Sequence, residues 1–423
     1  RYAGRGGFDS HPFPPDYLKI QWSKMESSDD SEILEHIVRR VFQIEDITYG
    51  TNQQAYRVRY RGHLLQPDSA TAYDQLSALL KPYQLTPLFR VEEKKQVIYL
   101  VSALPAPKPG RPLVNLLMFL LTLVSVLVSG GLTSFEGELS KQPFTAALEL
   151  FRAGWPFAVS LLAILAAHEF GHYFAGRAHG VHVTLPFFIP LPFTPLGTMG
   201  AFINMKEIPR NRRVLMDIGV AGPIAGYIVS ILVILIGLSL SRLDTLPLHF
   251  PPGHGVQMEG NSLTYLLLKY IHFGQVLPQP ASYGNTAPLL YWLRYFFTGR
   301  PFPLGGLDVM IHPVAWAGWA GLLVTSLNLI PAGQLDGGHI FQLLFGAKWS
   351  RRILPFILVG LVGLGFVWSG WWLWAMLVFL FGRVYAEPLD QITQLDPLRK
   401  ALGFTALVIF LLTFIPVPLS VIA

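Results

Sequence analysis

The chain has 423 residues, of which 52% are hydrophobic and only 14% are charged, and its mean hydropathy is +0.42. Soluble domains carry about 25% charged residues, so this composition excludes a wholly soluble enzyme and indicates an integral membrane protein with a soluble part. The net charge of +6 does not indicate a nucleic-acid partner, because the basic residues cluster beside apolar segments. The absence of cysteine excludes disulfides and thiolate zinc sites.

The first 104 residues precede every long apolar segment. Residues 1–29 begin with a Pro- and Gly-rich stretch, and we expect them to be disordered, with Met25 as the candidate native start. Residues 30–104 are expected to form a small soluble α+β domain without a catalytic motif, for which a docking or regulatory role and a structural role fit equally well. The predicted elements are helices over 31–44 and 67–80, a strand over 55–65, and a hairpin of 88–91 and 96–101 with a charged turn over 92–95.

Residues 105–112 form a Pro-rich linker, and residues 113–423 are expected to form an all-α polytopic membrane domain with about seven transmembrane helices. Each predicted span approaches the roughly 20 apolar residues that a bilayer requires. Two shorter apolar stretches, 263–271 and 289–297, are expected to form interfacial helices in a long loop over 241–312. The predicted spans cover residues 113–133, 155–177, 214–240, 313–345, 353–369, 371–387 and 402–420.

The distribution of lysine and arginine predicts how the membrane domain is oriented, because basic loops remain on the cytoplasmic side. One short loop contains only Lys141 and Arg152. The opposite side, which includes the soluble N-terminal domain, should be cytoplasmic, or stromal in an organelle. We therefore expect a multi-pass protein of a prokaryotic cytoplasmic membrane or an organelle membrane. The basic residues that flank the spans on this side are Lys108, Arg111, Arg177, Lys206, Arg210, Arg212, Arg213, Lys348, Arg351, Arg352, Arg383, Arg399 and Lys400.

His168, Glu169 and His172 form a His-Glu-x-x-His motif inside the predicted span over 155–177. On a helix, positions four apart share a face, so both imidazoles can bind one zinc ion. Glu169 is placed to take a proton from the attacking water. Ionisable groups within a span are costly and require a partner that neutralises or ligates them, which favours a metal site over a polar patch.

A hydrolytic zinc site requires three protein ligands and an open position for water. Few acidic residues lie in the predicted spans, and Asp336 is the best candidate for the third ligand. Pro331 and Gly333 interrupt its helix, and irregular backbone at membrane depth is tolerated where it lines a polar cavity. Gly337 and Gly338 allow backbones to approach closely.

Asp217 and His339 are the alternatives for this ligand. We expect Asp217 to pair with Arg212 or Arg213. Two other roles are open to His339. It is either a polar group that is hydrogen-bonded at a helix end, or a hydrogen-bond donor that supports Asp336 from one turn away.

The segments His168-Glu169-Phe-Gly-His172 and Leu335-Asp336-Gly337, in this order on membrane helices, resemble the site-2 protease family of intramembrane zinc metalloproteases. The soluble domain before the core resembles the cyanobacterial and chloroplast branch. The resemblance covers about residues 155–345. It implies that His168, His172 and Asp336 bind one zinc ion, that Glu169 is the general base, and that the substrates are transmembrane segments of other membrane proteins.

The same resemblance implies where the substrate lies. Asn328, three residues before Pro331, matches the family's Asn-x-x-Pro element, which implies that Asn328 helps to hold an unwound substrate. Residues 196–203 resemble the β-like loop that follows the zinc helix. Gly200 and Phe202 are candidate substrate contacts, because an exposed edge in this Pro- and Gly-rich region could pair with an unwound strand. An ordinary re-entrant loop fits these residues equally well. The segment 222–226, Gly-Pro-Ile-Ala-Gly, predicts close helix packing.

Three other functions are compatible with parts of this pattern. A zinc or ion transporter would need polar groups through the full depth of the membrane and would not need Glu169. A non-catalytic membrane scaffold would not need a complete ligand set. A membrane protease of the prenyl-processing type shares His-Glu-x-x-His but requires a glutamate ligand on a later helix, whereas this chain has Asp336 followed by Gly337.

Overall fold

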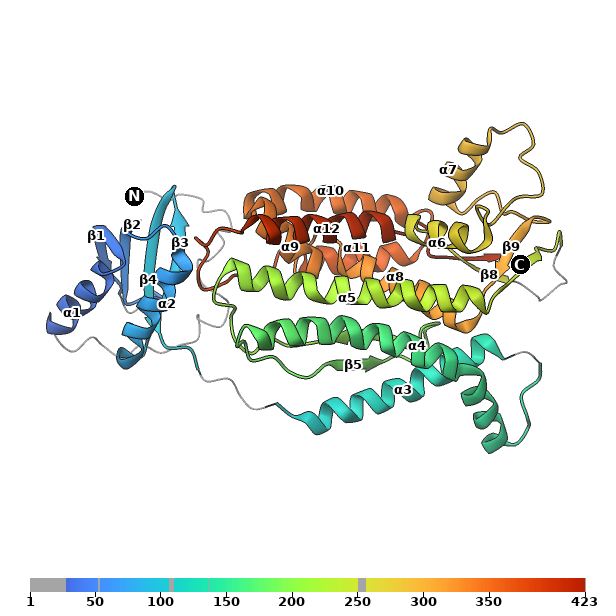
Figure 1. Cartoon of the computed structure of the whole chain (residues 1–423), viewed down its shortest axis with the longest axis horizontal. Helices are drawn as coiled ribbons and strands as arrows, with labels where there is room; N and C mark the ends of the chain where they lie inside the picture. Colours follow the sequence, from blue (N-terminus) through green and yellow to red (C-terminus); the bar gives the residue numbers. More distant parts are fainter. Residues whose placement is uncertain (1–27, 52–53, 106–109, 136, 250–255, 423) are drawn as a thin grey trace, which may run out of the picture. The chain divides into compact units, whose positions relative to one another are not determined.

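The chain divides into two compact units in a computed structural model (Figure 1). The first unit contains the amino-terminal domain together with the segments Lys206–Leu215 and Ala386–Pro397, and the second contains the remaining residues from Pro109 onward. The predicted disorder at the amino terminus and the candidate start at Met25 fall almost entirely outside the described residues. The structure describes residues 28–51, 54–105, 110–135, 137–249 and 256–422.

The amino-terminal domain is a four-stranded antiparallel sheet against which two helices pack. The spatial strand order is β1-β2-β4-β3, so β1 and β3 are its edges. Leu76 and Leu80 from one helix and Phe89 and Ile98 from the strands are fully buried in its core. The elements are α1 (Ser28–Arg39), β1 (Phe42–Tyr49), β2 (Val58–Leu64), α2 (Ser69–Leu80), the short 3-10 helix η2 (Lys81–Tyr83), β3 (Leu85–Glu92) and β4 (Lys95–Ser102).

The elements predicted in this domain are confirmed except at its beginning. The predicted second helix, the central strand and the hairpin are present, and the hairpin turns at Glu93 and Lys94, which both have positive φ. The predicted first helix ends at Arg39, and β1, which its hydrophobic spacing does not predict, follows. Phe42 is fully buried and pairs with Leu64 of β2, so strand pairing outweighs the local helical pattern.

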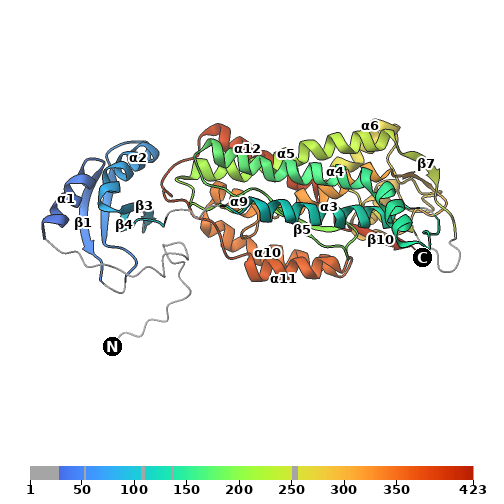
Figure 2. The same ribbon diagram turned by 90° about the horizontal axis from the view of Figure 1, so that it is seen from below.

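The second unit is mainly helical, and its long helices run side by side (Figures 1 and 2). The helices α3 (Pro112–Ser134), α4 (Pro143–Ala178) and α5 (Arg212–Ser239) are long and apolar enough to cross a membrane. They confirm the first three predicted apolar helices. α4 is longer than predicted, because it continues through Pro156 toward its amino terminus.

Of the four later predicted spans, the one over 353–369 corresponds to a single helix of 19 residues, and the other three are divided or shorter than predicted. The one over 313–345 divides between Asn328 and Asp336, as Pro331 and Gly333 predict. The last one ends at Thr413, before a short strand. Within the described residues, three helices meet the length and composition of a span, so helix length does not establish seven. The later helices are α8 (Pro313–Asn328), α9 (Asp336–Phe345), α10 (Ala347–Gly365), α11 (Gly370–Phe381) and α12 (Pro397–Thr413).

The chain between α5 and α8 contributes three strands to two short antiparallel pairs that the sequence pattern does not predict. β7 pairs with β9, and β8 pairs with β10 near the carboxyl terminus. The two short helices predicted in this loop, α6 and α7, are present. The bounds are β7 (Arg242–Thr245), β8 (Val256–Glu259), α6 (Leu263–Phe273), α7 (Pro288–Thr298), β9 (Leu307–Met310) and β10 (Leu419–Ile422).

Three ionisable residues interact in this region: Lys269 and Asp308, which are buried, and Glu259, which is partly buried. Lys269 of α6 is completely buried, and its Nζ lies 4.5 Å from the centre of the Tyr265 ring. The Tyr265 hydroxyl donates a hydrogen bond of 3.0 Å to Glu259 of β8. Desolvation by burial raises the pKa of Glu259 to about 7 and also raises the pKa of Asp308, although the positive charge of Lys269 opposes both shifts.

We predict that this region loses stability as the pH rises. The pKa of Glu259 is higher in the folded chain than its ordinary value of 4.5, so folding favours the protonated acid, and this stabilisation is lost as the pH rises through about 7. The melting temperature of purified protein in detergent should therefore be lower at about pH 8 than at about pH 6. The corresponding loss in the free energy of unfolding is on the order of 1–3 kcal/mol.

The variant Glu259→Gln should flatten this dependence, because its side chain stays neutral. Asp244→Asn, a change at an exposed position of β7, serves as the matched control and should melt like the parent protein. A pH dependence that persists unchanged in Glu259→Gln would assign it to other groups.

Candidate metal site

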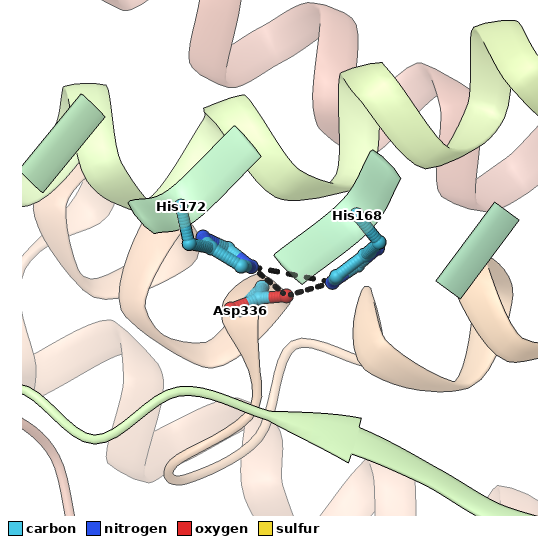
Figure 3. A group of neighbouring side chains, drawn as sticks. All are labelled: His168, His172 and Asp336. Atoms are coloured by element: carbon cyan, nitrogen blue, oxygen red, sulfur yellow. Dashed lines mark hydrogen bonds and ion pairs between the residues drawn. The ribbon is translucent and has the colours of Figure 1, made fainter. Parts of the chain in front are cut away.

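His168 and His172 lie one turn apart on α4 and point to the same side of it (Figure 3). Their side chains are almost completely buried, with residue exposures of 4% and 6%. The two Nε2 atoms are 3.2 Å apart, and the ring planes are nearly perpendicular. The helical spacing of the motif therefore brings both imidazole nitrogens to one point.

Asp336, the first residue of α9, completes the group (Figure 3). Its Oδ2 lies 3.3 Å from the Nε2 of His168 and 3.3 Å from the Nε2 of His172. The backbone that presents it folds back tightly: a Cβ at Gly337 would lie 2.0 Å from the carbonyl oxygen of Leu329. This position therefore requires glycine, and the break after α8 is what directs the carboxylate toward the histidines.

The size of this triangle fits zinc. A tetrahedral zinc ion with ligand bonds of about 2.0–2.1 Å has ligand atoms about 3.3 Å apart, and the three donor atoms are 3.2, 3.3 and 3.3 Å apart. Two imidazole nitrogens and one carboxylate oxygen are also a donor set that zinc prefers. Among the described residues, these three form the group of His, Asp and Glu side chains that could hold a metal ion.

α5 holds the histidines in place. The Nδ1 of His172 lies 2.7 Å from the carbonyl oxygen of Ile218, which can only accept, so Nδ1 carries the proton and the lone pair of Nε2 is free for a metal. Gly222 lies directly against this ring, because a Cβ there would be 2.1 Å from Nε2, and Gly226 lies against His168 in the same way, at 3.0 Å from Nδ1. The close packing predicted from the Gly-Pro-Ile-Ala-Gly segment is confirmed, and its cause is the two histidine rings.

Glu169 is also buried, with 5% of its surface exposed. Its carboxylate accepts a hydrogen bond from the backbone of Ile203, the residue after strand β6 (Thr198–Phe202). A carboxylate beside two metal-binding histidines and against a strand can take a proton from a water molecule that lies between them. This contact between the motif glutamate and the strand is not evident from the sequence.

The alternative ligands lie in other surroundings. Asp217 pairs with Arg399, through bonds of 2.8 and 2.6 Å, and with His179 at 2.9 Å. The expected pairing of Asp217 with Arg212 or Arg213 is therefore wrong, because the basic partner comes from α12, far away in the sequence.

His339 is the other alternative, and it follows Asp336 by three residues on α9. It is hydrogen-bonded to the backbone of Gln334. This is the helix-end contact expected for it, and it is not one of the three donors that meet.

The candidate substrate contacts lie on two elements. Strands β5 (Phe187–Pro190) and β6 (Thr198–Phe202) form an antiparallel hairpin, so the predicted β-like loop is present. Gly200 has φ +107°, with open space where a side chain would be, and Phe202 is 48% exposed and stacks on Phe187. The Nδ2 of Asn328, at the end of α8, lies 3.4 Å from the Nε2 of His168.

We predict that Gly222→Ala weakens zinc binding, because the new methyl group would occupy the space of the His172 ring. Displacing the group that orients a metal ligand typically costs about 10- to 100-fold in affinity, and zinc titration of the purified, metal-stripped variant would measure the loss. Gly360→Ala on α10 is the matched control, since nothing lies within 4 Å of a Cβ there. Equal zinc affinity in the two variants would contradict the packing argument.

Comparison with known proteins agrees with this geometry. Residues 156–366 match the model of Peptidase family M50. The chain is 28% identical to "Probable zinc metalloprotease EGY2, chloroplastic" of Arabidopsis thaliana over 89% of this chain and 63% of that protein. It is 32% identical to "Probable zinc metalloprotease EGY1, chloroplastic" of the same organism over 63% of this chain and 43% of that protein.

The chain thus spans less than two thirds of the length of these curated relatives. A match of 27% identity to "Probable zinc metalloprotease EGY3, chloroplastic" of Oryza sativa covers 62% of this chain and 42% of that protein. No solved structure matches the chain. The zinc-site geometry, the family match over residues 156–366 and these relatives agree, and the chain belongs to peptidase family M50, the site-2 proteases, in its chloroplast-like branch.

Proposed function

We propose that this protein is an intramembrane zinc metalloprotease that hydrolyses peptide bonds within the transmembrane segments of other membrane proteins. The observation that supports this most strongly is the convergence of His168, His172 and Asp336 beside a buried Glu169. These four residues provide a complete hydrolytic site within apolar helices. A transporter or a scaffold would not require a general base at this point.

The three donors would hold one zinc ion, which supplies Lewis acidity toward the scissile carbonyl and the attacking water. Glu169 then performs the proton transfers: it takes a proton from the water as the water attacks, and it delivers that proton to the nitrogen of the departing amine. The hydrogen bond from the backbone of Ile203 holds the carboxylate in place between these two tasks.

A transmembrane substrate must unwind before its peptide bonds are accessible, because its amides are hydrogen-bonded within a helix. We propose that β6 receives the unwound segment as an added strand. The open space above Gly200 and the exposed Phe202 support a close approach of another backbone, and the amide of Asn328 lies beside the histidines where it could bind a substrate carbonyl.

We further propose that the chain crosses the membrane seven times. In this topology α8 and α9 form one span, which is interrupted where the backbone presents Asp336 to the site, and α10, α11 and α12 supply three more. The asymmetry of lysine and arginine supports a cytoplasmic or stromal position for the amino-terminal domain. The chloroplastic names of the relatives support an organelle membrane, and a prokaryotic cytoplasmic membrane is the alternative.

Glu169→Gln should abolish cleavage and retain zinc, because the amide cannot accept the proton and does not belong to the ligand triangle. The loss should be at least about 10²-fold in kcat for a model transmembrane peptide in detergent or liposomes. Glu149→Gln on the same helix is the control, since Glu149 accepts a hydrogen bond from the backbone of Ser140 and does not belong to the ligand triangle. Cleavage by Glu169→Gln at the parental rate would eliminate it as the base.

Asp336→Ala should lower the zinc content of the purified protein well below one ion per chain, because it removes one of three ligands. Metal analysis after equilibration with limiting zinc would measure this. Asp217→Ala should keep its zinc, because Asp217 is bound to Arg399 and His179 and not to the donor triangle. If zinc were lost from Asp217→Ala and kept by Asp336→Ala, the assignment of the third ligand would be reversed.

A further inference from the structure

The amino-terminal sheet does not end at its edge strand β3. The segment Ala386–Pro397, which leads into α12, runs parallel to β3 at Phe89 and Asp390. The amide of Phe89 donates to the carbonyl of Leu389 at 2.9 Å, and the amide of Gln391 donates to the carbonyl of Phe89 at 3.1 Å. The segment is therefore hydrogen-bonded to the sheet like an additional strand.

A second segment, Lys206–Leu215, adds to the first. The amide of Leu389 donates to the carbonyl of Pro209 at 3.0 Å, and the amide of Asp390 donates to the carbonyl of Arg210 at 2.8 Å. A parallel bridge joins Asn211 to Asp390. The two segments thus extend the sheet beyond β3, and the compact unit is a composite of residues from three separate parts of the chain.

Two buried charged side chains hold these segments. The Arg90 guanidinium, with 3% of the residue exposed, donates through one nitrogen to the carbonyls of Pro388 and Leu389 at 3.1 and 2.8 Å. The Asp390 carboxylate is fully buried and accepts a hydrogen bond of 2.8 Å from the hydroxyl of Ser69 on α2. Its other partners are the hydroxyl and the backbone amide of Thr393 and the amide of Ile392. Burying a charged side chain is costly unless it is hydrogen-bonded, so these bonds make the attachment specific.

The attached segments are directly continuous with the catalytic machinery. Lys206–Leu215 begins three positions after Ile203, which contacts Glu169, and it continues into α5, where Ile218 holds the His172 ring. One stretch of backbone therefore joins the support of the general base to the support of a zinc ligand, and its middle is built into the soluble unit.

The second segment reaches the same helix from another direction. Ala386–Pro397 continues into α12, where Arg399 binds Asp217 on α5 with bonds of 2.8 and 2.6 Å. Both segments held by the soluble sheet thus lead, within a few residues, to the beginning of α5.

We propose that the soluble domain positions the active site, with Arg90 and Asp390 as the positioning residues. By holding both segments, they set the alignment of the Ile203 backbone and of α5, and through these the alignment of Glu169 and His172. The inference rests on the proposed proteolytic function. It differs from a simple tether, because a tether would attach the domain without any effect on the rate of the chemical step.

Because the chain contains no cysteine, the positioning role can be tested with one pair of introduced cysteines, by comparing the reduced and the oxidised form of the same variant. The hydroxyl oxygens of Ser69 and Thr393 are 3.0 Å apart, and a disulfide requires side chains that are this close. The double variant Ser69→Cys, Thr393→Cys, prepared in the whole 423-residue chain, loses both hydroxyl donors to Asp390 when it is reduced. When it is oxidised, a covalent bond replaces them and fixes the segment to α2.

With a model transmembrane peptide, the reduced double variant should have a kcat at least about tenfold below that of the parent chain, because a small misplacement of a catalytic group has effects of this size. Its zinc content and KM should be unchanged. Oxidation should restore kcat, and hydrogen exchange of residues 209–211 and 389–391 should slow in parallel. Each single cysteine variant, which cannot form the bond, should show no response to oxidation.

Arg90→Met provides an independent variant that keeps the aliphatic stem and removes the donors, and it should also lower kcat at constant zinc content. Arg39→Met on α1, whose side chain pairs with Glu35 at the surface, is its control. The positioning role would be overturned if the double variant had the same kcat in both redox states and Arg90→Met had the kcat of the parent chain. Absence of cleavage by the parent chain itself would instead overturn the proposed function, and this inference with it.

Discussion

Two imidazoles and a carboxylate converge within 3.3 Å of one another in an apolar helical unit, and the rest of the site follows from this constraint. Such groups are stable away from water only when they are ligated or neutralised. The requirement explains the break between α8 and α9 that directs Asp336 inward, and the glycine at 337 that permits it. It also explains why α5 presents a carbonyl to His172 and glycine to both rings.

In the proposed function, the same region brings a peptide bond and a water molecule to the metal. The β5–β6 hairpin provides a strand beside the zinc helix, and the backbone after it holds Glu169. The proposed general base and the proposed substrate strand are thus parts of one local structure. Chain continuity then extends this structure into the soluble unit, whose sheet incorporates the backbone that links Ile203 to α5. A domain without catalytic motifs is in this way physically connected to the chemistry.

Local sequence patterns predict most of the secondary structure. They fail where an element forms only by pairing with a segment that is distant in the sequence. The apolar runs of α3, α4 and α5 and the alternation of the β3–β4 hairpin are strong signals, because each reflects burial of one continuous segment. The pattern does not predict β1, because Phe42 continues the helical spacing of α1, although it pairs with Leu64. The strands β7 to β10 are four residues each and depend on partners far away in the sequence, so no local period identifies them.

The sequence alone determined the chemistry of this protein: a spacing of four residues places His168 and His172 on one helical face, and an interrupted apolar helix indicates Asp336 as their partner. Only the tertiary structure decided which groups support that chemistry. The partner of Asp217, the contact of Ile203 with Glu169 and the attachment of two membrane-domain segments to the soluble sheet all join residues that are distant in the chain. Periodicity reports which face of an element is buried, whereas the identity of the group opposite is set by packing in three dimensions.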